Sequence, residues 1–173
     1  QTYTLDTGAG QLTLNGGFYR SLGASTISIN GTGADSVLLN AGGPTDVVVA
    51  DGGAINLNVP SIVGAGNSLV VTAGATGTIT FAPGISISDA GQAYTAGTMN
   101  FLGSAMLTST SANSAISFFG GTVSTAGDLT VQTTGASSGV SFVNAPLTVG
   151  GDLLAVTSGT GSTLSITGGA INT

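Results

Sequence analysis

Apolar residues recur at every second position in short segments along this chain. The clearest segments carry the pairs Ile116 and Phe118, Leu129 and Val131, Val140 and Phe142, and Leu164 and Ile166. A period of two predicts β-strands rather than helices. Glycine, asparagine, serine and proline interrupt the segments, as at residues 120–121 and 144–146, so each strand spans four or five residues. No segment has the i, i+3, i+4, i+7 apolar spacing of a helix. We therefore expect an all-β fold.

A spacing of about 24 residues, which lies within the range of known repeat proteins, relates three of these segments, at 115–118, 139–142 and 163–166. Positions between them agree as well: the aligned sets are Val123/Leu147/Ile171, Ser114/Ser138/Ser162 and the Gly-Asp-Leu segments 127–129 and 151–153. A looser copy lies at 68–85. The segments 1–4 and 92–95 resemble each other, which places Tyr3 and Tyr94 at matching positions. A period of this length indicates a solenoid.

One repeat has the length of one coil in a three-sided parallel β-helix. At about 3.3 Å per residue, a repeat of about 24 residues traces at most roughly 80 Å, and successive coils pair about 4.8 Å apart. Equivalent residues then stack, so that Phe118, Phe142 and Ile166 form an internal apolar column. We predict a single parallel β-solenoid segment over residues 1–173, right-handed by the usual crossover rule. A β-sandwich is the alternative, and the coil length within 35–67 stays open.

Charged residues make up 5% of the chain, against roughly 25% in ordinary globular proteins. Lysine, histidine, glutamate, cysteine and tryptophan are absent, Arg20 is the single cation, and all seven acids are aspartates. Stacked coils place like residues about 5 Å apart. A column of lysine or glutamate would repel itself, whereas serine, threonine and asparagine can hydrogen-bond within a column. The composition therefore agrees with stacking.

The same composition excludes several functions. A net charge of −6 argues against nucleic acid, because one arginine cannot neutralise a row of phosphates. Apolar runs of a few residues, such as 47–50, are far shorter than the ~20 that span a bilayer as a helix, so we expect no membrane insertion. The chain cannot use histidine, cysteine, lysine or glutamate in catalysis, because its sequence contains none of them. We predict no cofactor and no enzymatic activity, and rank a polysaccharide-active β-helix enzyme last.

The unit from Ile116 through Val123 to Val131, and its copy from Val140 to Leu153, resemble filamentous-haemagglutinin-type repeats. The resemblance covers mainly residues 68–173. It implies a right-handed β-helix in an adhesin exported by a two-partner or autotransporter route, and hence an extracellular, cell-surface or secreted location. We expect the stalk of a bacterial surface fibre; a self-assembling filament or sheath subunit is the alternative.

The two ends of the chain bear on its expected partners. The sequence opens on a strand-like segment at 1–4 and stops within a repeat at 170–173. Neither end resembles the polar cap of a solenoid, so we expect either a piece of a longer repetitive chain or subunits stacked end to end. The expected partners are further copies of this chain, end to end or side by side, and host or neighbouring-cell surfaces or their glycans.

Three aspartates are candidate Ca²⁺ ligands. Asp128 and Asp152 lie one repeat apart and are expected to stack at one corner. Asp35 lies in the segment 31–37, which partly matches a Ca²⁺-binding nonapeptide repeat. The favoured interpretation is that all three are turn residues, because aspartate caps turn backbones. We therefore expect no metal.

Tyr19 and Phe119 are the candidate contact residues. Tyr19, with Tyr3 and Tyr94, belongs to the few aromatics that could stack on sugars, and packing is the alternative role for Tyr3 and Tyr94. Phe119 is expected to face outward because Phe118 faces inward. Three Thr-x-Thr pairs suggest ice binding, but their irregular spacing argues against a registered face: Thr2/Thr4, Thr78/Thr80 and Thr108/Thr110.

Overall fold

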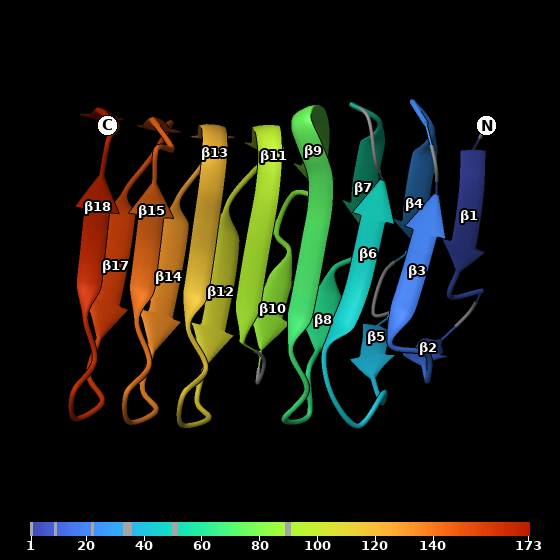
Figure 1. Ribbon diagram of the computed structural model, residues 1–173, viewed down its shortest axis with the longest axis horizontal. Coiled ribbons are helices and arrows are strands. Elements are labelled where there is room, and N and C mark those ends of the chain that lie inside the picture. Colours follow the sequence, from blue (N-terminus) through green and yellow to red (C-terminus); the bar gives the residue numbers. More distant parts are fainter. Residues whose placement is uncertain (1, 9, 22, 33–35, 50–51, 89–90) are drawn as a thin grey trace.

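The chain winds into a parallel β-solenoid of about seven turns (Figure 1). The computed structural model describes residues 2–8, 10–21, 23–32, 36–49, 52–88 and 91–173. Every strand pair among these residues is parallel, which confirms the solenoid and excludes the antiparallel β-sandwich. Strands at the front of Figure 1 run upward, those behind run downward, and the chain advances from right to left, so the coil is right-handed. The described residues include no helix that could cross a membrane.

Each coil contributes to three faces. The first face contains β1 (Thr2–Asp6), β4 (Thr26–Asn30), β7 (Ala54–Asn58), the C-terminal parts of β9 (Leu69–Phe81), β11 (Gln92–Phe101) and β13 (Ile116–Thr125), then β16 (Leu147–Val149) and β19 (Ile171–Asn172). The second face contains β2 (Gln11–Leu14), β5 (Ser36–Leu39), β8 (Ser61–Val63), β10 (Ser86–Ser88), β12 (Ala105–Ser109), β14 (Leu129–Thr133) and β17 (Leu153–Thr157). The third face contains β3 (Phe18–Ser21), β6 (Thr45–Val49), the N-terminal parts of β9, β11 and β13, then β15 (Val140–Val143) and β18 (Leu164–Thr167).

The register predicted from the repeat is confirmed in the C-terminal half. Phe118 pairs with Phe142 and Phe142 with Ile166, and Val123 pairs with Leu147. Upstream the coils differ in length. Thr26 pairs with Ala54, which makes that coil longer than the repeat, and Thr78 pairs with Thr98, which makes that coil shorter. The longer coil accounts for the poorly resolved repeat within 35–67.

The number of residues in a given corner also differs from coil to coil. The corner from the third face to the first takes eight positions from Val71 to Ile79 but five from Phe118 to Val123, and the pairing of β9 with β11 shows register shifts there. This corner lies within β9, β11 and β13, and the strands keep register on both sides of it although its length varies. The three faces therefore continue through the whole described chain although the period does not.

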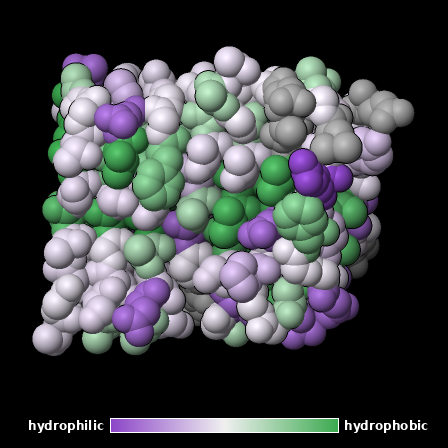
Figure 2. All heavy atoms as spheres, viewed as in Figure 1, coloured by the Kyte–Doolittle hydropathy of each residue, from purple (hydrophilic) through white to green (hydrophobic). Residues whose placement is uncertain are grey.

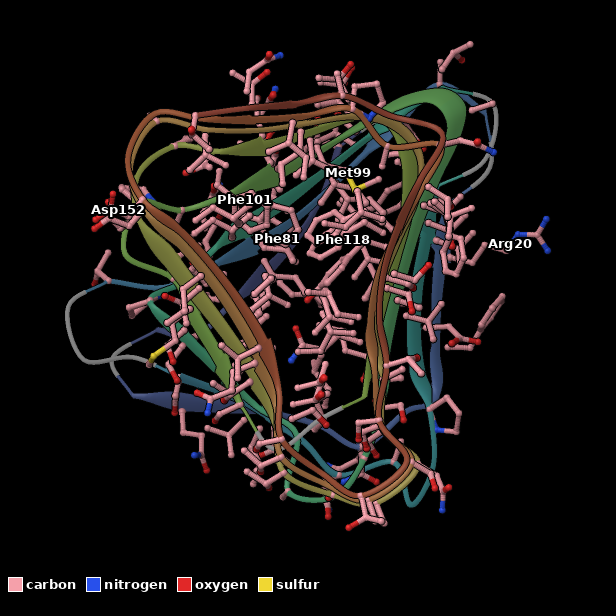
Figure 3. The ribbon with its side chains drawn as sticks, turned by 90° about the vertical axis from the view of Figure 1, so that its left-hand side faces the viewer. Arg20, Phe81, Met99, Phe101, Phe118 and Asp152 are labelled. Atoms are coloured by element: carbon pink, nitrogen blue, oxygen red, sulfur yellow. The ribbon has the colours of Figure 1, made fainter. Side chains whose placement is uncertain are left out.

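Inward-facing residues form continuous apolar columns. Two columns carry the aromatic rings (Figure 3). Phe81 stacks on Phe101 with ring centroids 4.0 Å apart, and Phe118 stacks on Tyr94 at 5.3 Å and on Phe142 at 4.7 Å. All five side chains are buried. These columns fix each coil above the next, because aromatic pairs add about 0.5–1.5 kcal/mol to their area burial.

The expected match of Tyr3 with Tyr94 is wrong. Tyr3 pairs with Ile27 on the first face, whereas Tyr94 pairs with Val71 on the third face, in the column that begins at Tyr19. The two segments share residue types but lie on different sides of the triangle. Tyr94 is also fully buried, so it belongs to the core and not to the exposed aromatics.

Glycines let the backbone stack closely where the third face turns into the first. Gly120 has φ of 99°, a left-handed conformation that favours glycine. Its neighbour Gly121 lies over Gly97, and a Cβ atom on Gly121 would overlap the carbonyl oxygen of Gly97. This corner therefore leaves no space for a side chain.

We predict that Gly121→Ala lowers the free energy of unfolding by about 1–3 kcal/mol, because the added methyl group forces the two coils apart. Gly43→Ala is the control: nothing lies within 4 Å of a Cβ atom there, and its φ is not positive. Chemical denaturation followed by circular dichroism measures both variants. Equal stability of the two variants would contradict the close stacking.

Candidate functional site

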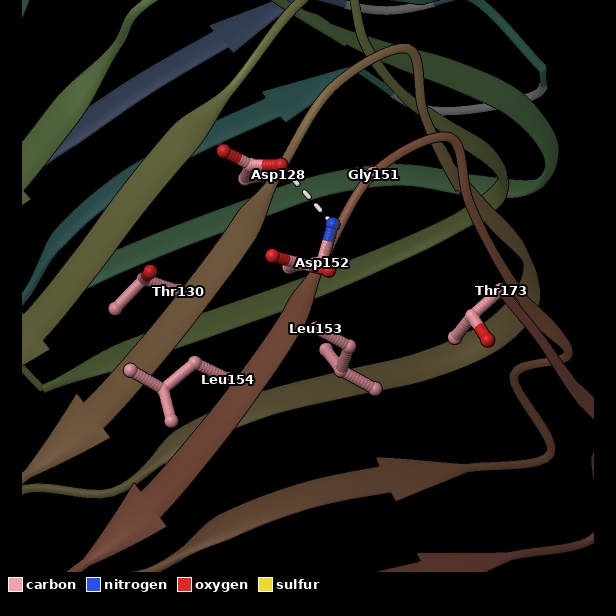
Figure 4. A pocket seen from close by; sticks show the side chains of 7 residues that line it. All are labelled: Asp128, Thr130, Gly151, Asp152, Leu153, Leu154 and Thr173. Carbon is pink, nitrogen blue, oxygen red and sulfur yellow. Dashed lines mark hydrogen bonds between the residues drawn. The ribbon is translucent and has the colours of Figure 1, made fainter.

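The aspartate corner consists of Ser104, Asp128 and Asp152, which directly precede β12, β14 and β17 where the first face turns into the second. Figure 4 shows Asp128 and Asp152 at this corner. The Asp152 backbone N–H donates to Asp128 Oδ1 at 3.0 Å, and the Asp128 backbone N–H donates to Ser104 Oγ at 3.1 Å. The side chains of Ser104 and Asp128 thus each accept a hydrogen bond from the backbone of the following coil. The expected stacking of Asp128 and Asp152 at one corner is present.

This geometry supports a structural role for the aspartate corner. Asp128 already uses one carboxylate oxygen on the backbone, and Ser104 performs the same role one coil earlier with a neutral hydroxyl. Ca²⁺ takes six to eight oxygen ligands. The described residues contain no group of three or more aspartates, glutamates, histidines or cysteines that could hold a metal. Asp35, the third candidate, lies outside the described residues.

The two contact candidates lie on the third face. Phe119 is 39% exposed while Phe118 is fully buried, as the alternation predicts. Phe119 borders a shallow groove that Pro44, Val70, Ala93 and Ser117 also line. Figure 2 shows patches of apolar side chains on this face, among more numerous side chains of intermediate or polar character. Phe119 therefore lies exposed at the edge of this groove.

Tyr19 is half-buried and packs against the core. Its hydroxyl accepts a hydrogen bond from the Gly16 backbone N–H at 3.2 Å. Its ring lines a hollow with Tyr3, Leu5 and Ile27, and Arg20 borders the same hollow. Tyr19 therefore combines the packing role with partial exposure at the N-terminal coil.

A buried polar pair lies among the apolar columns, and sequence reasoning missed it. Tyr94 Oη donates to Gln92 Oε1 at 2.9 Å, and Gln92 Nε2 donates to the Thr108 carbonyl oxygen at 3.1 Å. Gln92 occupies the inward position that Leu69 and Ile116 fill in the adjacent coils. A glutamine at an apolar position of the alternation was the available signal. The hydrogen bonds satisfy both side chains inside the solenoid.

Burial raises the pKa of the Tyr94 hydroxyl well above its ordinary value. The charged tyrosinate would lose its hydration in the apolar core. Because the unfolded chain ionises this group near pH ~10, its stabilising effect is complete below that pH. The effect is lost as the pH rises towards the folded pKa, since the unfolded state then binds fewer protons than the folded state.

The Thr-x-Thr pairs are more regular than their sequence spacing indicated. Thr2/Thr4 and Thr78/Thr80 lie at equivalent outward positions of the first face, joined by the registers of β1, β4, β7 and β9. Thr108 lies apart from them, on β12 of the second face. The variable coil length hid this alignment in the sequence.

These features define a repeat protein of the parallel β-solenoid class. Comparison of the chain with family models, with curated proteins and with solved structures found no match. The class therefore follows from the strand registers and the stacked columns alone.

We predict that Tyr94→Phe removes part of the loss of stability at alkaline pH. Above about pH 10, each pH unit costs the wild-type chain up to about 1.4 kcal/mol through this single group. The free energy of unfolding, measured by denaturation across the alkaline range, should therefore fall less steeply in Tyr94→Phe. Tyr3→Phe is the control, because Tyr3 is 50% exposed. Identical slopes in all three proteins would contradict the assignment.

We predict that Asp128→Ala destabilises the chain by about 1 kcal/mol, because the Asp152 N–H loses its acceptor. Asp128→Ser should lose less, since serine performs this role at position 104. Addition of Ca²⁺ or of a chelator should leave the unfolding midpoint of the wild-type chain unchanged. A midpoint that rises with Ca²⁺ and no longer does so in Asp128→Ala would contradict the structural role.

Proposed function

We propose that this chain is a rigid stalk segment of an extracellular bacterial surface fibre, with a structural and adhesive role. The observation that carries the proposal is the continuous coil-over-coil register across the described chain. In a solenoid each coil contacts mainly its neighbours, so length grows linearly with the number of coils. At about 4.8 Å per coil, seven coils give a rod on the order of 35 Å, and further coils would extend it without altering the packing.

Polar side chains link successive coils of the rod by hydrogen bonds. Ser141 Oγ donates to Ser117 Oγ at 2.9 Å, and Ser124 Oγ donates to Asn100 Oδ1 at 2.7 Å. The backbone N–H groups of Ser114 and Ser138 donate to the hydroxyls of Ser138 and Ser162 at 3.0 and 3.2 Å. Such bonds join successive coils along the axis. They give stiffness without charge, which suits a spacer better than a catalyst.

The adhesive part of the proposal rests on the third face. Phe119 and the groove beside it offer an apolar surface for a sister fibre or for a neighbouring cell surface or its glycans. The extracellular location rests on the resemblance to filamentous-haemagglutinin-type repeats and on the composition. An enzyme on the same scaffold ranks below, because the sequence lacks histidine, cysteine, lysine and glutamate.

Immunogold electron microscopy of intact source cells, with antibodies raised against this chain, tests the proposal. We expect gold along thin fibres outside the cell and an extracted species far larger than the 16.4 kDa of this chain. Cells lacking the gene are the control. Fibres built from a species near 16.4 kDa would instead identify a self-assembling filament subunit. Label confined to the cell interior would overturn the proposal.

A further inference from the structure

The outer surface of the first face carries an array of small, neutral side chains, all of them polar except Ala54. Two columns run along the solenoid axis, two residues apart on each strand. The first column contains Thr2, Thr26, Ala54, Thr78, Thr98 and Thr122. The second column contains Thr4, Ser28, Asn56, Thr80, Asn100, Ser124, Thr148 and Asn172. Apart from Ser28, these residues are half-buried or exposed.

The other two faces lack this uniformity. Outward positions of the second face include Met106, 48% exposed, and Leu154, 52% exposed, on either side of Thr130. Those of the third face include Phe18, 57% exposed, and Phe119. Stacking alone therefore does not require the array, since both other faces stack equally well with apolar or aromatic residues outside.

The array has two fixed spacings. Residues two apart on a strand lie about 6.6 Å apart, and equivalent residues on successive coils lie about 4.8 Å apart. Threonine is stiff at χ1 because it is β-branched. In the second column, Asn56 Nδ2 donates to Ser28 Oγ at 3.2 Å and Ser124 Oγ donates to Asn100 Oδ1 at 2.7 Å. These hydrogen bonds and the stiff threonine side chains limit the movement of the hydroxyl and amide groups in the array.

The chemistry of the array selects its ligand. The two columns contain no charged residue. At the next outward position of the same face, Asp6 of β1 carries a charge, but Asn30 and Asn58 occupy that position in the following coils. The face is therefore neutral away from its N-terminal strand. The two columns contain no aromatic ring on which a sugar could stack. Apart from Ala54, they present neutral hydroxyl or amide groups at regular intervals in two directions, which matches a ligand that repeats in two directions. Water held on such a surface can bridge to a ligand nearly as well as a direct hydrogen bond.

We propose that the first face binds ice, with the threonine column and the Ser/Thr/Asn column ordering the water layer that joins the solid surface. The contact is between a rigid, uncharged protein lattice and an uncharged lattice of water molecules. This inference is independent of the proposed stalk function, because it concerns the isolated chain and requires neither a fibre nor a cell surface.

Slow freezing of a dilute solution of the chain, with measurement of the protein in the solid and liquid fractions, tests the proposal. We expect wild-type protein to be enriched in the ice and to separate the melting temperature from the temperature of ice growth. Thr98→Tyr should weaken the binding about tenfold, because a ring in the middle of the array holds the surface away from the lattice. Thr122→Tyr, on the next coil of the same column, is the second variant.

Thr130→Tyr is the matched control, because Thr130 faces outward on the second face. It should bind ice as the wild-type chain does. Circular dichroism and the unfolding midpoint show that each variant is folded. Exclusion of wild-type protein from the ice, or an equal loss in Thr130→Tyr, would overturn the proposal. Retention on powdered chitin or cellulose without enrichment in ice would also overturn it and identify a polysaccharide surface instead.

Discussion

The parallel hydrogen bonding of each coil to the next is the interaction on which the rest of this structure depends. It runs along the solenoid axis and sets equivalent residues of successive coils directly over one another. Each paired strand residue therefore has a neighbour of its own column about 4.8 Å away. A residue is acceptable only if it tolerates that neighbour. Aromatic rings inside and hydroxyls or amides outside meet this condition, and lysine or glutamate columns would not.

This constraint also explains how the chain uses its few special residues. Gly121 stacks on Gly97 at a corner that leaves no space for a Cβ atom. Asp128 occurs at a corner where its carboxylate can accept the N–H of the next coil, so one aspartate is balanced by backbone rather than by a cation. Gln92 and Tyr94 satisfy each other within a core that is otherwise largely apolar. In each case the residue works through its neighbours in the stack.

The sequence predicted the fold class and the C-terminal coils well, because there the corners keep constant lengths and the period stays constant. It predicted the stacking of Asp128 on Asp152 and the outward side of Phe119 for the same reason. It failed where the corner lengths change. The spacing in sequence between equivalent residues changes at two places, between Val71 and Ile79 and in the long coil from Thr26 to Ala54. The equivalent residues nevertheless lie on the same faces. The similarity of the segments 1–4 and 92–95 therefore led to the wrong prediction that Tyr3 and Tyr94 occupy matching positions, although they lie on different faces.

The array on the first face cannot be recognised from the sequence period alone. Thr2/Thr4 and Thr78/Thr80 lie far apart in the sequence, at a separation that no single repeat length explains, yet the strand registers place them in the same two columns. Corners absorb insertions because their backbone hydrogen bonds do not set the register, whereas strands cannot shift by one residue without exchanging the inner and outer sides. A regular surface in a solenoid therefore depends on the strand positions and not on the sequence spacing between them. The two columns of the first face keep small neutral residues, all polar except Ala54, through coils of unequal length. A stalk requires only that columns be compatible, and the second and third faces meet that requirement with leucine, methionine and phenylalanine. The uniformity of the first face is thus a property that stacking permits but does not explain.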